Sequence, residues 1–225
     1  MPEGAFLDLV QQVRDGIAPR SDLVELLAED SDAFAGRSAR DAARRRGWVL
    51  ATFESVGLPP PALPAVLDEL RSACDPYVTA AAARALRGAT HPPGHAADVL
   101  VSAFDAIRRR DDDVTFDAFR PNWKTAAATS ALTEILLSLR HVGSASAATV
   151  DRLRGMRTDV VLSPRVSSLL QDVVRELDTA TRAVVPATGV PSTCRPTSAV
   201  DRRRDQAEGM PARVGQHAER VGPVG

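Results

Sequence analysis

Apolar residues recur every three or four positions through most of residues 3–178, which is the spacing of one face of an α-helix. In the stretch from Asp75 to Gly88, the apolar stripe consists of Val78, Ala81, Ala82, Ala85 and Leu86. Asp75 is a favourable N-cap, Pro76 suits the first helical position, and Gly88 is expected to end the helix in a left-handed conformation. The pattern predicts a helix whose narrow, alanine-rich face lets a neighbouring helix come close.

The same spacing predicts further helices between turns rich in glycine, proline and aspartate. We expect them at residues 3–15, after an N-cap at Ser21, and at 38–55, 62–74, 95–110, 125–141, 146–156 and 164–177. Residues 114–119 alternate weakly, and we interpret them as a helical continuation or an irregular packed segment because no partner strand is visible. Cys74 falls on the apolar face of its helix and is interpreted as a small core residue.

The second helix of each predicted pair starts near residues 38, 76, 125 and 164. These intervals of roughly 40 to 50 residues match the period of HEAT and armadillo repeats. With its Asp75-Pro76 turn and alanine stripe, the segment resembles a HEAT repeat and is similar to the HEAT-like repeats of phycobilin lyases. The resemblance covers roughly residues 20–178. It implies an all-α fold, a short right-handed α-solenoid of about four helical hairpins, and it brings no catalytic residues with it.

The character of the chain changes at Pro186, where glycine and proline become frequent and apolar periodicity stops. Such a segment buries too little apolar surface to offset its ordering entropy. We therefore expect a helical repeat domain over residues 1–185 and a disordered tail over 186–225. An alternative is that the tail is a non-native terminus left by the loss of a downstream domain.

Composition narrows the class of protein. Apolar residues make up 44% of the chain but aromatic residues only 4%, which favours closely packed helices. No run of about 18 apolar residues is present and an acidic residue comes early, so we expect neither a membrane helix nor a signal peptide, and a cytoplasmic location. The net charge of −1 argues against a general nucleic-acid binder, although a local basic patch stays open.

Motifs that would carry catalysis are missing from the sequence. It has no glycine-rich phosphate loop, no nucleophile elbow and no cysteine spacing typical of zinc. His91 and His95 are four residues apart, but two prolines between them exclude one continuous helix, so we interpret them as surface loop residues. We expect a protein that is not an enzyme and that has no metal and no cofactor.

Arginine supplies the candidate contacts. Two runs of three arginines, 44–46 and 108–110, each turn through most of a helix circumference, so at least one side chain of each run faces outward. Arg37, Arg40 and Arg44 recur at i, i+3 and i+7 and predict a basic stripe on one helix. This stripe is either a solvated face or a docking surface for an acidic partner. Trp123 is predicted in a turn, and Trp48 beside the first run is either core filler or an interaction hot spot. The candidate partner-binding residues are Arg37, Arg40, Arg44, Arg45, Trp48, Arg108 and Arg109.

The function favoured by this reasoning is a non-catalytic scaffold or regulatory protein that binds another protein, because stacked helical hairpins present an extended surface. The first alternative is a nucleic-acid-binding or DNA-repair protein of HEAT-like fold. The second is an accessory domain of a longer protein, since similar HEAT segments occur beside thioredoxin-like redoxins of the copper-delivery type. The redoxin and its CxxxC motif are absent from this sequence.

Overall fold

A computed structural model describes residues 1–28, 31–110, 113–117, 128–159 and 162–184. All of them belong to one unit of the chain, Met1–Pro186. The predicted tail, Trp123, Asp111 and Asp112 lie outside the described residues. Within the described residues, the α-helices are α1 (Glu3–Arg14), α2 (Arg20–Leu26), α3 (Ala39–Val56), α4 (Leu63–Ser72), α5 (Pro76–Arg87), α6 (Ala96–Arg109), α7 (Ala131–Val142), α8 (Ala147–Asp159) and α9 (Pro164–Val184), preceded at α4 by the 3-10 turn η1 (Pro60–Ala62).

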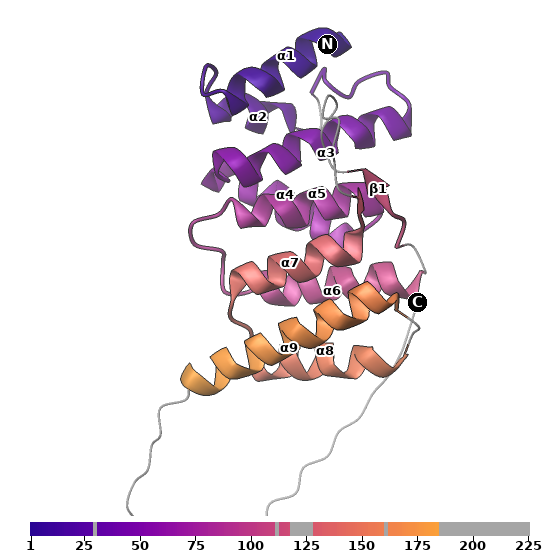
Figure 1. Ribbon diagram of the computed structural model, residues 1–225. Coiled ribbons are helices and arrows are strands. Elements are labelled where there is room, and N and C mark those ends of the chain that lie inside the picture. Colours follow the sequence, from indigo (N-terminus) through magenta and orange to yellow (C-terminus); the bar gives the residue numbers. More distant parts are fainter. Residues whose placement is uncertain (29–30, 111–112, 118–127, 160–161, 185–225) are drawn as a thin grey trace, which may run out of the picture. The chain divides into compact units, whose positions relative to one another are not determined.

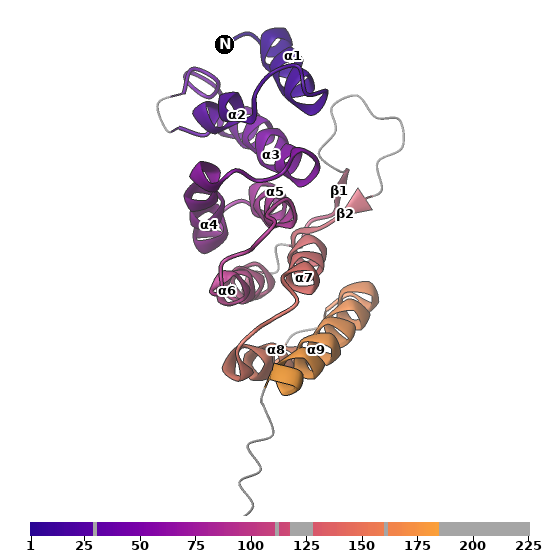
Figure 2. The ribbon, with the colours of Figure 1, turned by 90° about the vertical axis from the view of Figure 1, so that its left-hand side faces the viewer.

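The helices pack in two adjoining rows, which Figures 1 and 2 show from two directions. In one row α3 packs on α5, α5 on α7 and α7 on α9. In the other row α4 packs on α6 and α6 on α8, while each consecutive pair, α4 with α5, α6 with α7 and α8 with α9, also packs together. The all-α prediction is confirmed. The α-solenoid class stays a prediction, and this packing is compatible with it.

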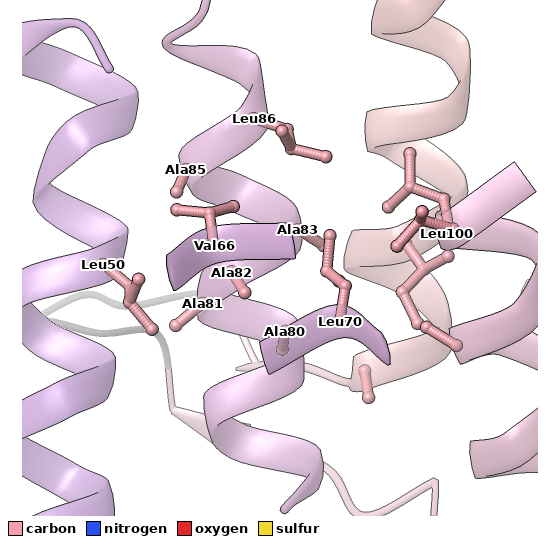
Figure 3. Packing of buried hydrophobic residues seen from close by; sticks show 14 of the residues in the cluster. Leu50, Val66, Leu70, Ala80, Ala81, Ala82, Ala83, Ala85, Leu86 and Leu100 are labelled. Atoms are coloured by element: carbon pink, nitrogen blue, oxygen red, sulfur yellow. The ribbon is translucent and has the colours of Figure 1, made fainter. Parts of the chain in front are cut away.

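Helix α5 begins as its sequence predicts. The Asp75 carboxylate accepts a hydrogen bond of 3.0 Å from the Val78 amide, and Pro76 occupies the first turn. Alanines on all sides of α5 are buried, and they pack between leucines and a valine of α3, α4 and α6 (Figure 3). Because these side chains are so small, α5 can sit close to several helices at once. α5 is therefore the central helix of the described packing.

Gly88 acts differently from its prediction as a left-handed helix end. Its φ of −80° is an ordinary right-handed value. A Cβ atom at this position would lie 1.9 Å from the carbonyl oxygen of Phe53. The Gly88 carbonyl also accepts a 2.8 Å hydrogen bond from the Leu58 amide. Glycine is needed here because the end of α5 touches the backbone that follows α3, a contact that no local pattern reveals.

The segment between α6 and α7 contains a strand pair in place of the expected helical or irregular segment. Strand β1 (Phe116–Asp117) pairs antiparallel with β2 (Ala128–Thr129). The helix expected from residue 125 accordingly begins only at α7, where the Ser130 hydroxyl accepts from the Thr133 amide. The ring of Phe116 meets Tyr77 edge-on, with centroids 5.0 Å apart. Two short segments that pair across a long connection leave no periodic signal in the sequence.

Two smaller expectations near helix ends are also corrected. Cys74 is exposed, because α4 ends at Ser72 and Ala73 takes a left-handed conformation that turns the chain out of the helix. Helix α2 starts at Arg20 with Pro19 as its N-cap, so Ser21 lies inside the first turn. In both cases the apolar pattern predicted the helix correctly, but the predicted end was wrong by one or two residues.

Candidate functional site

The predicted basic stripe on α3 is largely paired within the chain. Arg44 is exposed and its guanidinium contacts the carboxylates of Asp41 at 2.7 Å and Glu3 at 3.2 Å. Arg37 lies before the start of α3 and so outside the helix that was predicted to carry it. It is half-buried and donates to Asp41 at 3.1 Å and to the Ala33 carbonyl at 3.0 Å. Arg40 is exposed. Asp41 and Glu3 therefore neutralise much of the positive charge on this face.

Arg45 lies in the interior, contrary to its prediction as a surface contact, and Trp48 is also buried, which agrees with its interpretation as core filler and not as an interaction hot spot. The exposed fractions are 0% for Arg45 and 7% for Trp48. The Arg45 guanidinium lies over the Phe6 ring at 4.8 Å, and the Trp48 ring stacks on the same phenyl at 6.3 Å. Burial lowers the pKa of Arg45, and the neighbouring charge of Arg37 lowers it further. The physical reason is that α1 packs across α3 and covers this side of it.

A second arginine cluster surrounds Asp105 on α6. The buried Arg108 guanidinium contacts Asp105 Oδ1 at 2.6 Å and donates to the Met156 carbonyl at 3.4 Å. Arg109 contacts the same carboxylate and is largely exposed. Arg152 on α8 approaches Asp105 Oδ2 at 3.6 Å. Of the two arginines predicted here, Arg109 lies on the surface and Arg108 is core.

Asp105 stays ionised within this cluster. Burial raises the pKa of its carboxyl, but hydrogen bonds from Arg108 and Arg109 outweigh that effect and hold it below its usual range. Sequence reasoning missed Asp105 and Arg152. A signal existed for the aspartate, because both arginine runs follow an Asp-Ala pair by the same spacing, in Asp41-Ala-Ala-Arg and Asp105-Ala-Ile-Arg. No sequence signal pointed to Arg152, which comes from another helix.

The last arginine of each run reaches the end of α4. Arg46 pairs with Glu69 in the last turn of that helix, and its guanidinium lies over the Phe34 ring at 5.7 Å. Arg110 donates to the carbonyl of Ala73, the C-cap of the same helix. Cations are favourable at helix C-termini, where carbonyl groups lack partners. Both arginines therefore have a structural role in the described residues.

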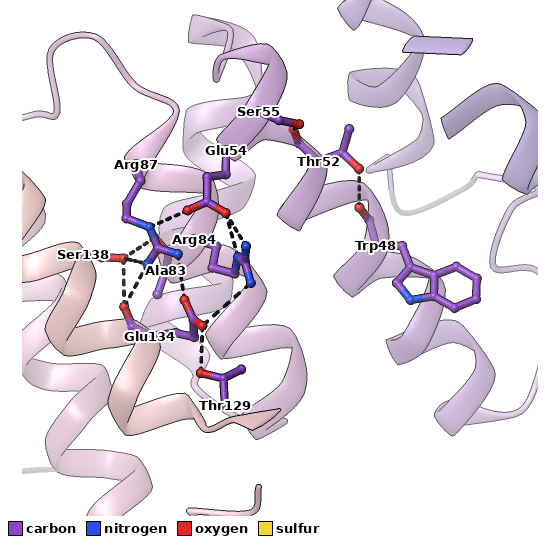
Figure 4. Close-up of polar contacts among 10 residues, drawn as sticks. All are labelled: Trp48, Thr52, Glu54, Ser55, Ala83, Arg84, Arg87, Thr129, Glu134 and Ser138. Carbon is purple, nitrogen blue, oxygen red and sulfur yellow. Dashed lines mark hydrogen bonds and ion pairs between the residues drawn. The ribbon is translucent and has the colours of Figure 1, made fainter. Parts of the chain in front are cut away.

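An ion-pair network joins three consecutive helices of the longer row, α3, α5 and α7 (Figure 4). Glu54 on α3 accepts from Arg84 Nε at 2.8 Å and from Arg87 Nε at 2.7 Å, both on α5. Arg87 also donates to Glu134 on α7 at 2.7 Å and to the Ser138 hydroxyl at 3.0 Å. With two arginines and two glutamates, the network is neutral and fastens neighbouring helices to one another.

The two arginines of this network favour the ionised form of Glu54. Burial raises the pKa of Glu54, but the charges and hydrogen bonds of Arg87 and Arg84 outweigh it and leave that pKa below its ordinary value. Glu134 is the most enclosed member, 4% exposed, and also accepts a hydrogen bond of 2.8 Å from Thr129. Sequence reasoning missed all of these residues, because single charged residues on mostly apolar helices carry no motif.

The two histidines singled out in the sequence lie on the surface. His91 and His95 are both exposed, as their loop positions predict. Within the residues that the structure describes, no three histidine, cysteine or acidic side chains gather in a way that could hold a metal ion. No helix in this part of the chain is both long enough and apolar enough to span a membrane.

The chain was compared with protein families, curated proteins and solved structures. No protein-family model, no curated protein and no solved structure matches the chain. The resemblance to HEAT repeats therefore stays a prediction from the sequence.

Proposed function

We propose that this protein is a non-catalytic scaffold of the HEAT-like, armadillo-type class that binds another protein. The observation that supports the proposal is the serial packing of α3, α5, α7 and α9, each helix against the next. Helices stacked in this way build an extended surface along the row, and such surfaces suit the binding of a protein partner. This support comes from the arrangement of the helices and not from an identified binding site.

The exposed members of the predicted set indicate what kind of partner fits. Arg40 and Arg44 lie on α3 and Arg109 lies on α6, all exposed, whereas Arg45, Trp48 and Arg108 are not accessible. Arginine is enriched at protein interfaces, and a partner with an acidic surface is complementary to these side chains. Nucleic acid is the less favoured partner, because the chain has a net charge of −1 and pairs many arginines internally.

The test is a cross-linked pull-down from the native cell lysate with the full chain as bait. The variant Arg40→Glu with Arg44→Glu reverses two exposed charges on α3. Arg71→Glu on α4, outside the row of α3, α5, α7 and α9, is a control for charge reversal at an exposed site. A defined protein that is recovered by the wild type and the control but lost with the α3 variant would support the proposal. Recovery of salt-sensitive nucleic acid alone would overturn it in favour of the nucleic-acid alternative.

A further inference from the structure

Two exposed guanidinium groups from different helices share one carboxylate oxygen. Arg109 Nη2 on α6 lies 3.1 Å from Asp105 Oδ2, and Arg152 Nη2 on α8 lies 3.6 Å from the same atom. The two Nη2 atoms can therefore be no farther apart than the sum of these two distances. About 70% of the Arg109 side chain and 47% of the Arg152 side chain are exposed, so both are open to a ligand.

The single negative charge of Asp105 does not neutralise the two positive charges of Arg109 and Arg152. Asp105 carries one negative charge, and its Oδ1 also accepts from the buried Arg108 at 2.6 Å and from Arg109 Nε at 3.1 Å. Among the described residues, Asp105 is the acid with which Arg109 and Arg152 pair. Like charges held this close repel each other, and a further anion between them would relieve the repulsion.

The surroundings hold Arg152 in place. Its Nη1 lies 3.0 Å from the Ser102 hydroxyl on α6, while its Nη2 faces Asp105. The two helices are fastened nearby by the Thr149 hydroxyl, which donates to Asp98. Both guanidiniums are thus oriented before any ligand arrives, which reduces the entropy lost on binding.

We propose that Arg109 and Arg152 form a docking site for a phosphorylated serine or threonine on the partner protein. A phosphate monoester carries about −1.5 to −2 charges at pH 7, which matches two guanidiniums better than the single charge of a carboxylate. Planar guanidinium forks bind phosphate oxygens in pairs, and clusters of arginine are a recurring means of recognising phosphorylated segments. This inference rests on the proposed protein-binding function and names the chemistry of the partner.

The experiment follows the side-chain Nε–Hε signals of arginine by ¹⁵N NMR, with the full chain at low and at physiological ionic strength. The probes are N-acetyl-phosphoserine amide, inorganic phosphate and N-acetyl-aspartate amide. With the phosphoserine probe we expect saturable shifts at Arg109 and Arg152. The double variant Arg109→Gln with Arg152→Gln should weaken its binding by about tenfold or more. Arg175→Gln, whose guanidinium pairs with Asp172 alone in the described residues, should leave binding unchanged.

Several outcomes would overturn the inference. Equal shifts at Arg175 would show non-specific screening, binding of inorganic phosphate alone would indicate a site for the free ion, and equal affinity for the aspartate probe would indicate carboxylate recognition. Asp111 and Asp112 follow the arginine run in the sequence. Shifts that appear only after Asp111→Asn with Asp112→Asn would mean that the natural chain already occupies the pair. None of these results bears on the pull-down, which depends on Arg40 and Arg44.

Discussion

Arg87 on α5 and Glu134 on α7 form a nearly enclosed ion pair of 2.7 Å that joins two neighbouring helices. Arg87 extends the contact by donating to the backbone carbonyl of Glu134 at 3.3 Å and to the hydroxyl of Ser138 at 3.0 Å. Ser138 in turn donates to the carbonyl of Ala83 on α5. The pair thus links side chains and backbone of both helices. Loss of either partner would leave the other charged group between the helices with fewer compensating contacts.

We predict that Glu134→Gln destabilises the protein by about 3 kcal/mol, because it removes one of the two carboxylates and leaves the half-buried arginines with an unbalanced positive charge. Urea-induced unfolding followed by circular dichroism measures the change. The matched control is Asp68→Asn, which breaks the exposed pair with Arg71 and should cost less than about 1 kcal/mol. Equal losses of stability from the two substitutions would show that the network contributes no more to stability than an exposed ion pair does.

Acid should weaken the same network. Arg87 and Arg84 hold the pKa of Glu54 below its ordinary value of 4.5. A depressed folded-state pKa contributes stability above the unfolded value, and this contribution is lost as the pH falls through the folded-state pKa. The difference in free energy of unfolding between wild type and Glu54→Gln should therefore be full at pH 7 and shrink below about pH 4.5. A difference that stays constant down to pH 3 would contradict this assignment.

Gly88→Ala should be strongly destabilising, by about 3 kcal/mol or more, because the new methyl group would overlap the Phe53 carbonyl oxygen and force the backbone apart. Gly155→Ala is the matched control. Gly155 lies in α8 with open space around it, and alanine favours a helix over glycine by about 1 kcal/mol. Thermal unfolding should show a lower Tm for the first variant and a higher one for the second. A neutral Gly88→Ala would mean that the α3–α5 contact is not as close as described.

Arg45→Met should change stability little or raise it. Among the described residues, Arg45 Nε and Nη2 lack hydrogen-bond partners, and the approach of Nε to Asp41 is long at 4.0 Å. The two carbonyls that Arg45 contacts, those of Met1 and Ala33, each keep a donor in Arg37. An apolar side chain of similar length often replaces such a buried charge at no cost. A loss above about 2 kcal/mol in urea unfolding would show that Arg45 is an essential anchor of α1.

Local patterns in the sequence were sufficient to predict most of the helices. The Asp75 cap, Pro76 and the alanine stripe act within a few residues of one another, so the position of α5 and one of its buried faces could be predicted from the sequence. The burial of Ala80 and Ala83 outside that stripe depends on the neighbouring helices. The cap at Ser38 and the αL glycine at Gly143 act over the same short range and mark ends of α3 and α7. Helix formation depends mainly on such near neighbours, which is why the all-α class was accessible from sequence.

Which charged residues face outward could not be predicted from the sequence, because it depends on how the helices pack. Arg44 and Arg45 are adjacent in the sequence, yet one is exposed and the other is buried, because α1 happens to pack on one side of α3. Asp105 and Arg152 meet only because α6 and α8 pack together, and Gly88 meets Phe53 only because α5 lies against α3. Periodicity specifies the faces of a helix, but the identity of the neighbouring helix depends on contacts between residues far apart in the chain.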